Sequence, residues 1–348
     1  MSSSNRFHFL DSLRGFAVAG ILLVNAADLM CLGHDVPVRP FQAVPLAENV
    51  LNFLVATRFV PIFSFMFGMS MGFVIDSAIR RGAPAWKILL RRMAALLVIG
   101  LLHSILYPGE ILRDYAVTGA ILLPFALKVP RSVRLVLGLL ATVGAYAFTG
   151  GGALSLPGLF LLGSAAQAYG LPARLEHADR RIGAATLVFA AASAAAIPWQ
   201  AAEGGDPRFS TPGGIAGGLM ACLYISLLAL LWRTPVRRAL SAVFEPLGRM
   251  ALTCYVTASF VMVPAGVLLD SRSTHDVIPG LIVAAAALPL QWVFCRLWLS
   301  RFAYGPLEWA WRCVTWWRWV PLRRQQSQQP DNQSSPYRYA RLPTTGVM

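Results

Sequence analysis

An all-α bundle of membrane-spanning helices is the fold class that this sequence predicts, on three observations. Between Phe16 and Leu299 one apolar stretch follows another, and each is close to the roughly 20 residues that a helix needs to cross the hydrocarbon core. The Arg and Lys residues gather in every second loop between these stretches. The period-two alternation of a transmembrane β-barrel is missing from them.

Composition agrees with a membrane protein. Of the 348 residues, 56% are apolar and 13% are charged, against about 25% charged residues in soluble domains, and the mean hydropathy is +0.58. The net charge of +14 would suggest a nucleic-acid partner if the protein were soluble. Because the cations recur in alternate loops, we interpret them as topology determinants, expect the lipid bilayer as the partner and expect no nucleic acid.

The first apolar stretch is predicted to remain as a membrane anchor. Residues 1–14 are too polar, and the stretch that follows them too long, for a cleavable signal peptide. Charged loops or turn-forming residues separate the later stretches, among them Pro108-Gly109 and the glycine run 150–152. About ten helices are predicted, at residues 13–32, 51–78, 92–107, 111–127, 133–150, 155–170, 182–200, 213–232, 249–269 and 277–299.

The basic loops predict that both termini are cytoplasmic, since cytoplasmic loops are enriched in Lys and Arg. The cations predicted on that side are Arg6, Arg14, Arg80, Arg81, Lys87, Arg91, Arg92, Lys128, Arg131, Arg134, Arg174, Arg180, Arg181, Arg233, Arg237, Arg238, Arg249 and those from Arg296 to Arg324. The opposite side has only Arg39, Arg113, Arg208 and Arg272. An even number of helices agrees with this orientation.

Residues 1–320 are predicted to form a single transmembrane domain, and 321–348 a disordered cytoplasmic tail rich in Gln, Ser and Pro. Just before the tail, tryptophans alternate with arginines, which predicts an interfacial amphipathic segment. These residues are Trp309, Trp311, Arg312, Trp316, Trp317, Arg318, Trp319, Arg323 and Arg324. The five cysteines include no CxxC pair, so we expect free thiols and no metal site.

Polar residues in or beside the apolar stretches are the candidates for function, because charge at membrane depth is costly. Asp11 and Arg14 are three residues apart and can pair on one helix face, although an N-cap role for Asp11 explains it equally well. Asn25 follows on the same helix. In the second helix, Gly68 and Gly72 have the small-xxx-small spacing that permits close packing.

Two histidine–carboxylate pairs are candidates for acid–base chemistry. A turn at Pro108-Gly109 is expected to bring Glu110 back towards His103. The alternative pair is His34 with Asp35, which also fits a solvated loop. A carboxylate beside an imidazole raises its basicity and orients its tautomer.

Five blocks combine polar, aromatic and glycine residues within apolar surroundings: LDSLRGFAVAGILLVN (10–25), FSFMFGMSMGF (63–73), IGLLHSILYPGEIL with YAVTGAILLPF (99–125), GRMALTCY (248–255) and GPLEWAWR (305–312). Together they resemble the YeiB-type family of bacterial membrane proteins, domain of unknown function 418. Three positions depart from the family pattern. Cys254 stands where Asn is usual and Ala258 lies near a usual Gln, while Glu110 replaces a common Asp.

The opening block is similar to that of the transmembrane acyltransferase superfamily, which includes O-acetylases of surface sugars and the lysosomal heparan glucosaminide acetyltransferase. The resemblance implies a multi-pass protein of the bacterial inner membrane. It would move an acyl (acetyl) group from cytoplasmic acyl-CoA, its co-substrate, to a sugar or lipid acceptor of the cell envelope. No other cofactor is expected.

Residue roles follow from this resemblance. His103 with Glu110, or His34 with Asp35, would supply the base. The arginines expected beside the CoA phosphates are Arg14, Arg91, Arg92 and Arg249. The other polar residues expected to contact substrate or hold the site are Asp11, Asn25, Arg58, Tyr115, Thr253, Tyr255 and Glu308.

A small-molecule transporter with a buried His/Glu proton relay is the alternative. Ten helices would allow two inverted five-helix repeats. No segments similar to LRG or FSFMFG occur after residue 155. The absence of such a repeat argues against the transporter and favours the acyltransferase. A scaffold is the third alternative, and the polar blocks argue against it.

Overall fold

The computed structural model describes residues 6–37, 45–177 and 179–323. Over these ranges the fold is helical, and its one β-type contact is an isolated bridge between Phe302 and Arg323. The α-helices are α1 (His8–Leu29), α2 (Leu46–Leu54), α3 (Phe59–Arg80), α4 (Ala85–His103), α5 (Leu112–Lys128), α6 (Arg131–Thr149), α7 (Leu156–Ala168), α8 (Leu171–His177), α9 (Arg180–Glu203), α10 (Thr211–Leu231), α11 (Arg237–Arg249), α12 (Ala251–Leu268), α13 (Ile278–Arg301) and α14 (Pro306–Trp316). Three short 3-10 turns are η2 (Gly152–Ser155), η3 (Pro207–Phe209) and η4 (Ser271–Ser273).

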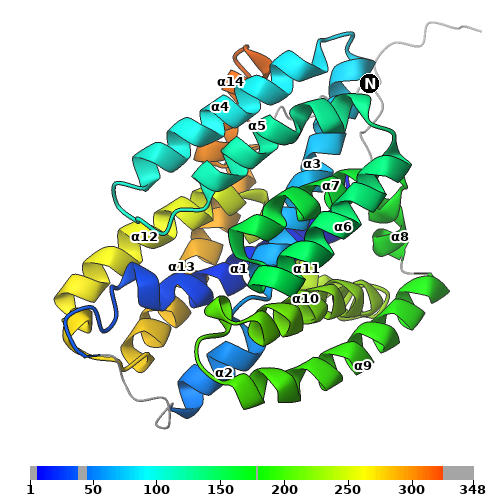
Figure 1. Cartoon of the computed structure of the whole chain (residues 1–348). Coiled ribbons are helices and arrows are strands. Elements are labelled where there is room, and N and C mark those ends of the chain that lie inside the picture. The colour runs from blue at the N-terminus through cyan, green and yellow to red at the C-terminus, as the bar shows by residue number, and fades with distance from the viewer. Residues whose placement is uncertain (1–5, 38–44, 178, 324–348) are drawn as a thin grey trace, which may run out of the picture.

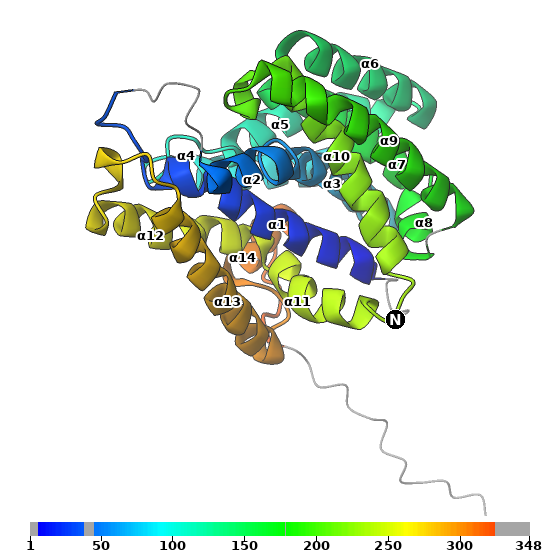
Figure 2. The ribbon, with the colours of Figure 1, turned by 90° about the horizontal axis from the view of Figure 1, so that it is seen from below.

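Helix α1 runs through the middle of the molecule (Figure 1). It packs against α3, α11, α12 and α13. Figure 2 shows α12 and α13 on one side of it and α6, α7, α9 and α10 on the other. Helices α4 and α5 form a hairpin, and α14 packs on α4.

Local sequence explains where several helices begin and end. The carboxylate of Asp179 caps α9 by accepting hydrogen bonds from the backbone N–H groups of Arg181 and Ile182. The hydroxyl of Ser210 caps α10 in the same way, at the N–H of Gly213. At the other end of α6, Gly150 adopts the left-handed conformation, with φ of 69°, that glycine reaches without a steric penalty.

Glycines allow α3 and α7 to approach closely, as the spacing of Gly68 and Gly72 predicts. A Cβ at Gly68 would overlap the backbone of Phe160, and one at Gly163 would overlap the carbonyl oxygen of Phe65. A Cβ at Gly72 would meet the side chain of Gln167. Small residues at such crossings let helix backbones touch in a membrane, where no hydrophobic force drives the helices together.

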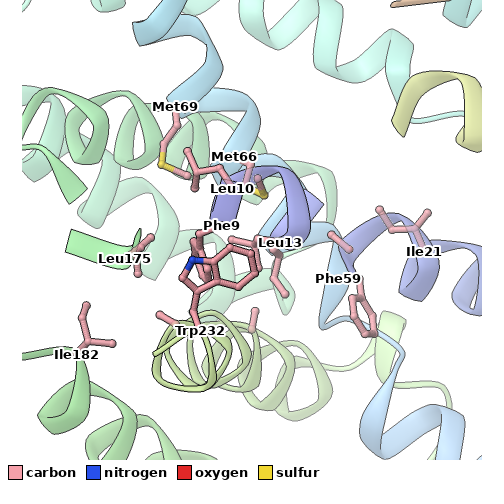
Figure 3. Close-up of a cluster of buried hydrophobic side chains, with 14 residues drawn as sticks. Phe9, Leu10, Leu13, Ile21, Phe59, Met66, Met69, Leu175, Ile182 and Trp232 are labelled. Carbon is pink, nitrogen blue, oxygen red and sulfur yellow. The ribbon is translucent and has the colours of Figure 1, made fainter. Parts of the chain in front are cut away.

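The first half of α1 anchors a buried apolar cluster (Figure 3). Phe9 and Leu13 point from α1 towards Trp232, and the rings of Phe9 and Trp232 meet edge to face at 5.7 Å. The indole N–H of Trp232 donates to Glu176 at 3.1 Å, so the large ring is buried with its polar atom satisfied. This cluster fixes α1 against α3 and α10.

Seven helical segments in the described ranges are long and apolar enough to cross a membrane, and an eighth results if α7 and α8, which meet at 74°, count as one span. The seven are α1, the stretch Leu46–Arg80, α6, α9, α10, α12 and α13. The predicted ten are therefore not confirmed. Three predicted spans are missing from the seven. Helix α4 carries three cations, Lys87, Arg91 and Arg92, and α5 and α7 are short, with 17 and 13 residues.

The predicted helix 51–78 is two helices in the structure. The break lies at Val55–Arg58, where Thr57 has a φ of 65°. The tryptophan-rich segment forms α14, and Trp311 donates from its indole N–H to the carbonyl of Arg92 at 2.8 Å. The cytoplasmic location of both termini stays a prediction, and the predicted disordered tail lies outside the described residues from 324 onward.

Candidate functional site

A cavity of about 600 Å³ lies beside α1, with walls from α3, α4, α5, α12 and α14. Asp11, Arg14, Val18, Ile21 and Asn25 line it from α1, at the alternating spacing of three and four that places residues on one helix face. Asp11 and Asn25 are 14 residues apart, which is about 21 Å at the helical rise. The cavity therefore follows α1 for most of its length.

One end of this central cavity is rich in arginine. Five arginines line it, against the two carboxylates of Asp11 and Glu308: Arg6, Arg14, Arg92, Arg249 and Arg312. Asp11 binds Arg6 at 2.7 Å and Arg14 at 3.3 Å, so the predicted Asp11–Arg14 pair is present and includes a third partner.

Arg92 is held within this group by its neighbours. Its guanidinium lies 3.6 Å from the centre of the Trp311 ring and donates to the Ser70 hydroxyl at 3.2 Å. Arg14 and Arg312 are close enough for their charges to act on it. Arginine clusters of this kind attract phosphate and carboxylate groups.

Glu308 of α14 lines the cavity and is held by Thr253 of α12, which lies behind the wall. The carboxylate of Glu308 accepts from the Thr253 backbone N–H at 2.9 Å and from its hydroxyl at 2.6 Å. Burial raises the pKa of Glu308, and the hydrogen bonds from Thr253 oppose that rise. Tyr115, also in the wall, shares a hydrogen bond of 2.6 Å with Ser64.

Near the other end of the cavity, three buried side chains form a continuous hydrogen-bonded chain. His103, the last residue of α4, contacts Glu110 through Nδ1. Its Nε2 lies 2.8 Å from the hydroxyl oxygen of Ser259 on α12. His103, Glu110 and Ser259 are 4%, 2% and 1% exposed.

The turn after α4 positions Glu110. The chain reverses at Pro108-Gly109, and the second carboxylate oxygen of Glu110 accepts the backbone N–H of Leu112 at the start of α5. The ring of Tyr255 packs edge-on against the His103 ring, with centroids 5.3 Å apart. These contacts fix both the carboxylate and the imidazole.

A second, small cavity of about 10 Å³ adjoins this chain of side chains. Ser259, Tyr107 and Gln291 line it, and Asn25 and Tyr255 line both it and the central cavity. Its volume is about that of one water site. Val18 and Ile21 line both cavities as well, so these four residues stand between the long cavity and the small one.

A third cavity, of about 420 Å³, lies on the other face of α1. Leu23, Ala27 and Met30 line it from α1, together with polar residues such as Arg208 and His275. Arg208 forms ion pairs with Asp28 and Asp206. Helix α1 thus separates two cavities.

His34 and Asp35 are not part of the central cavity. They lie exposed in the loop after α1, where Asp35 accepts two hydrogen bonds from Arg272 at 2.7 and 2.8 Å. Those hydrogen bonds hold the pKa of Asp35 below its ordinary value. The carboxylate is thereby engaged mainly with a cation of η4, and the neighbouring His34 acts on it only as a smaller contribution.

Two further predicted residues also lie elsewhere. Arg91 stacks on Trp317 at 5.1 Å. Arg58 is fully buried at the α2–α3 break and donates to Gln200 of α9 at 2.7 Å. The predicted residues that line the central cavity are Asp11, Arg14, Asn25, Arg92, Tyr115, Arg249, Tyr255 and Glu308.

Sequence reasoning missed Ser259 and assigned Arg6 and Arg312 to the membrane surface alone. Ser259 is one of four hydroxyl-bearing residues in α12 and lies 156 residues from His103, so no local pattern distinguishes it. Arg312 is the last residue of the block GPLEWAWR, and its place in that block could have marked it as a candidate site residue.

Comparison with known proteins identifies relatives without an assigned activity. The profile of the family described as "Protein of unknown function (DUF418)" matches residues 169–318. An "Uncharacterized 39.9 kDa protein in amylase 3'region" of Bacillus acidopullulyticus is 30% identical over 91% of this chain and 96% of its own length. The "Uncharacterized protein YxaH" of Bacillus subtilis is 27% identical over 92% of this chain and 97% of its own length. No solved structure matches the chain.

Proposed function

The chain belongs to the DUF418 family of proteins of unknown function, and we propose that it is a transmembrane acyltransferase. It would take an acyl group, such as acetyl, from a cytoplasmic acyl-CoA and deliver it to a sugar or lipid acceptor on the far side of the membrane. The observation that carries this proposal is the central cavity, which joins an arginine-rich end to the surroundings of a buried His103–Glu110 pair.

The arginine-rich end suits the phosphate groups of the donor. Arg14, Arg92 and Arg249 line it with Arg6 and Arg312, and guanidinium groups bind phosphate with two parallel hydrogen bonds. From Arg92 to His103 there are 11 residues of one helix, about 16 Å at the helical rise. The cavity gives the thioester arm a path from the cytoplasmic side towards the imidazole.

The contacts of His103 suit a general base. With Glu110 accepting at Nδ1, the neutral ring carries its proton there, and the Nε2 lone pair is left to accept a proton. The buried carboxylate then stabilises the imidazolium that forms when an acceptor hydroxyl loses its proton. Tyr255 and Tyr107 pack on the ring and keep it in place.

The proposal is tested by acetyl-CoA turnover in purified protein reconstituted in nanodiscs. We expect His103→Ala to lower acetyl-CoA hydrolysis and acetyl transfer by roughly 10²- to 10⁴-fold, the usual contribution of a general base. His177→Ala is the matched control, because this exposed histidine of α8 bonds only to the backbone of its own helix at Ala173 among the described contacts. Thermal unfolding of both variants verifies that they are folded.

A wild-type protein that neither binds nor hydrolyses acetyl-CoA would contradict the acyltransferase. The second candidate is the transporter with a His103–Glu110 proton relay, and the cavities on opposite faces of α1 favour it. In that case proton flux into liposomes would depend on His103 while thioester chemistry would be absent.

A further inference from the structure

Glu110, His103 and Ser259 stand in the order carboxylate, imidazole, hydroxyl. Glu110 contacts Nδ1 of the ring, and the Ser259 hydroxyl lies 2.8 Å from Nε2. The carboxylate orients the ring and the ring faces the hydroxyl, which is how a serine becomes a nucleophile in acyl transfer. The three residues come from the end of α4, the turn before α5 and the middle of α12.

We propose that Ser259 is the first acceptor of the acyl group, so that transfer proceeds through an ester on its hydroxyl. This inference rests on the acyltransferase proposed above and adds the covalent intermediate to it. Ser259 would be the residue that forms a bond to the substrate, and His103 the group that moves its proton.

Ser259 is among the buried helical hydroxyls that bond to a side chain from another element; Thr253, which donates to the Glu308 carboxylate, is a second. A helical Ser or Thr usually satisfies its hydroxyl at the carbonyl four residues earlier. Ser64 does so at Val60, and Thr257 at Thr253, each at 2.8 Å. Ser259 has its hydroxyl on the imidazole instead.

Access also favours Ser259 as the reacting atom. Of the three residues, Ser259 is the one that lines the small cavity. That cavity shares Asn25 and Tyr255 with the central cavity. The two cavities also share Val18 and Ile21. Because the small cavity has room for about one water, an acetyl group enters it only when a side chain of this shared wall moves aside.

The proposed reaction balances in two steps. In the first, the Ser259 oxygen attacks the thioester carbonyl while its proton passes to Nε2 of His103; the carbon–sulfur bond breaks and the proton leaves with the CoA thiol. In the second, an acceptor hydroxyl gives its proton to Nε2 and attacks the ester carbonyl. The bond to the Ser259 oxygen then breaks, and that oxygen regains the proton.

The test is acyl labelling of the full chain in nanodiscs with acetyl-CoA radiolabelled in the acetyl group and no added acceptor. We expect an alkali-labile label on the wild-type protein and exchange of the acetyl group with added free CoA. Ser259→Ala should lose both. Ser259→Cys should carry the label as a thioester that neutral hydroxylamine releases. Ser226→Ala, which removes a buried hydroxyl bonded to Leu223 in its own helix, should label as the wild type does.

Two results would overturn the inference and leave the acyltransferase intact. One is a folded Ser259→Ala that transfers acetyl at the wild-type rate. The other is a wild-type protein that transfers acetyl with neither a protein-bound label nor exchange with CoA. Since Ser259→Cys changes the chemistry of the label rather than abolishing it, a labelled cysteine variant whose label resists neutral hydroxylamine would also count against Ser259. Absence of all acetyl-CoA turnover in the wild type would instead contradict the proposed function itself.

Discussion

At the scale of single residues, two neighbouring arginines of α4 have different surroundings. Arg92 lines the central cavity, lies over Trp311 and donates to Ser70. Arg91 stacks on Trp317. Consecutive residues of a helix point about 100° apart. Arg92 therefore faces the cavity, while Arg91 lies over Trp317, the residue just after α14. From the sequence, both arginines were expected beside the CoA phosphates, because charge alone does not reveal which face of a helix lines a cavity.

This difference supplies a matched pair of variants. We expect Arg92→Gln to raise KM for acetyl-CoA about 10- to 100-fold, the equivalent of losing charged hydrogen bonds worth about 1.5–3 kcal/mol. Arg91→Gln should leave KM within about twofold. Steady-state kinetics in nanodiscs measure both. Equal effects of the two variants would mean that the cavity does not hold the donor phosphates.

The residue scale also shows what local sequence reveals about the candidate site. Glu110 follows His103 by seven residues across a Pro-Gly turn, so their contact was predictable. Ser259 meets the same imidazole from 156 residues away, and only the packing of α12 on the α4–α5 turn brings it there. The catalytic roles of all three stay predictions.

At the scale of elements, α1 depends on glycine for its position. A Cβ at Gly15 would overlap the carbonyl oxygen of Phe244, and one at Gly248 would overlap that of Asp11. Gly248 also offers its carbonyl to Arg14 at 3.4 Å. The contact between α1 and α11 therefore sets the arginine-rich end of the cavity as well as the helix spacing.

We expect Gly248→Ala to destabilise the protein by about 1–3 kcal/mol, because the extra methyl group forces the two backbones apart. Gly183→Ala is the control, since its Cβ would meet nothing within 4 Å. In a helix interior that change should be neutral or stabilising by about 0.5–1 kcal/mol. Thermal unfolding in the same detergent compares the variants, and a Gly248→Ala as stable as the wild type would contradict the close α1–α11 contact.

Helix existence was predictable from hydropathy, whereas helix continuity was not. The stretch Leu46–Arg80 is apolar throughout apart from a few residues, and its break depends on the positive φ of Thr57 and on burial of Arg58. The predicted helix 155–170 ends within two residues of the end of α7, but the short helix α8, which follows Tyr169-Gly170 at an angle of 74°, was not predicted. Tertiary contacts decide these breaks, and an average over a window of residues smooths them away.

At the scale of the whole molecule, the arginine-rich end of the central cavity and the basic loops lie on the same predicted side. Arg6, Arg14 and Arg249 line the cavity and also belong to the loops that predict the cytoplasmic face. A donor made in the cytoplasm would then meet the arginines first. The orientation of the chain and the proposed function therefore depend on one another.

Two native cysteines provide a test of this predicted orientation. Cys31 follows α1 and Cys313 lies in α14, and both are partly exposed. In single-cysteine variants we expect a membrane-impermeant maleimide to label Cys31 in right-side-out vesicles and Cys313 in inside-out vesicles. The reversed pattern would place the arginine-rich end outside and separate it from cytoplasmic acyl-CoA.

The buried Arg58–Gln200 pair sets an order for the assembly of the chain during synthesis. Arg58 is synthesised with the Leu46–Arg80 stretch, and the Gln200 side chain, which accepts one of its hydrogen bonds, follows 142 residues later. At about 5–20 residues per second, that is a wait of about 7 to 30 seconds. Until then, the acceptors described for the guanidinium are the Ala56 carbonyl and the Thr57 hydroxyl, both within the break. An arginine at membrane depth costs roughly 2.5–3.5 kcal/mol by insertion scales, so the α2–α3 break completes its packing only when α9 arrives. A chain interrupted before α9 would lack the Gln200 amide oxygen that accepts one guanidinium N–H of Arg58.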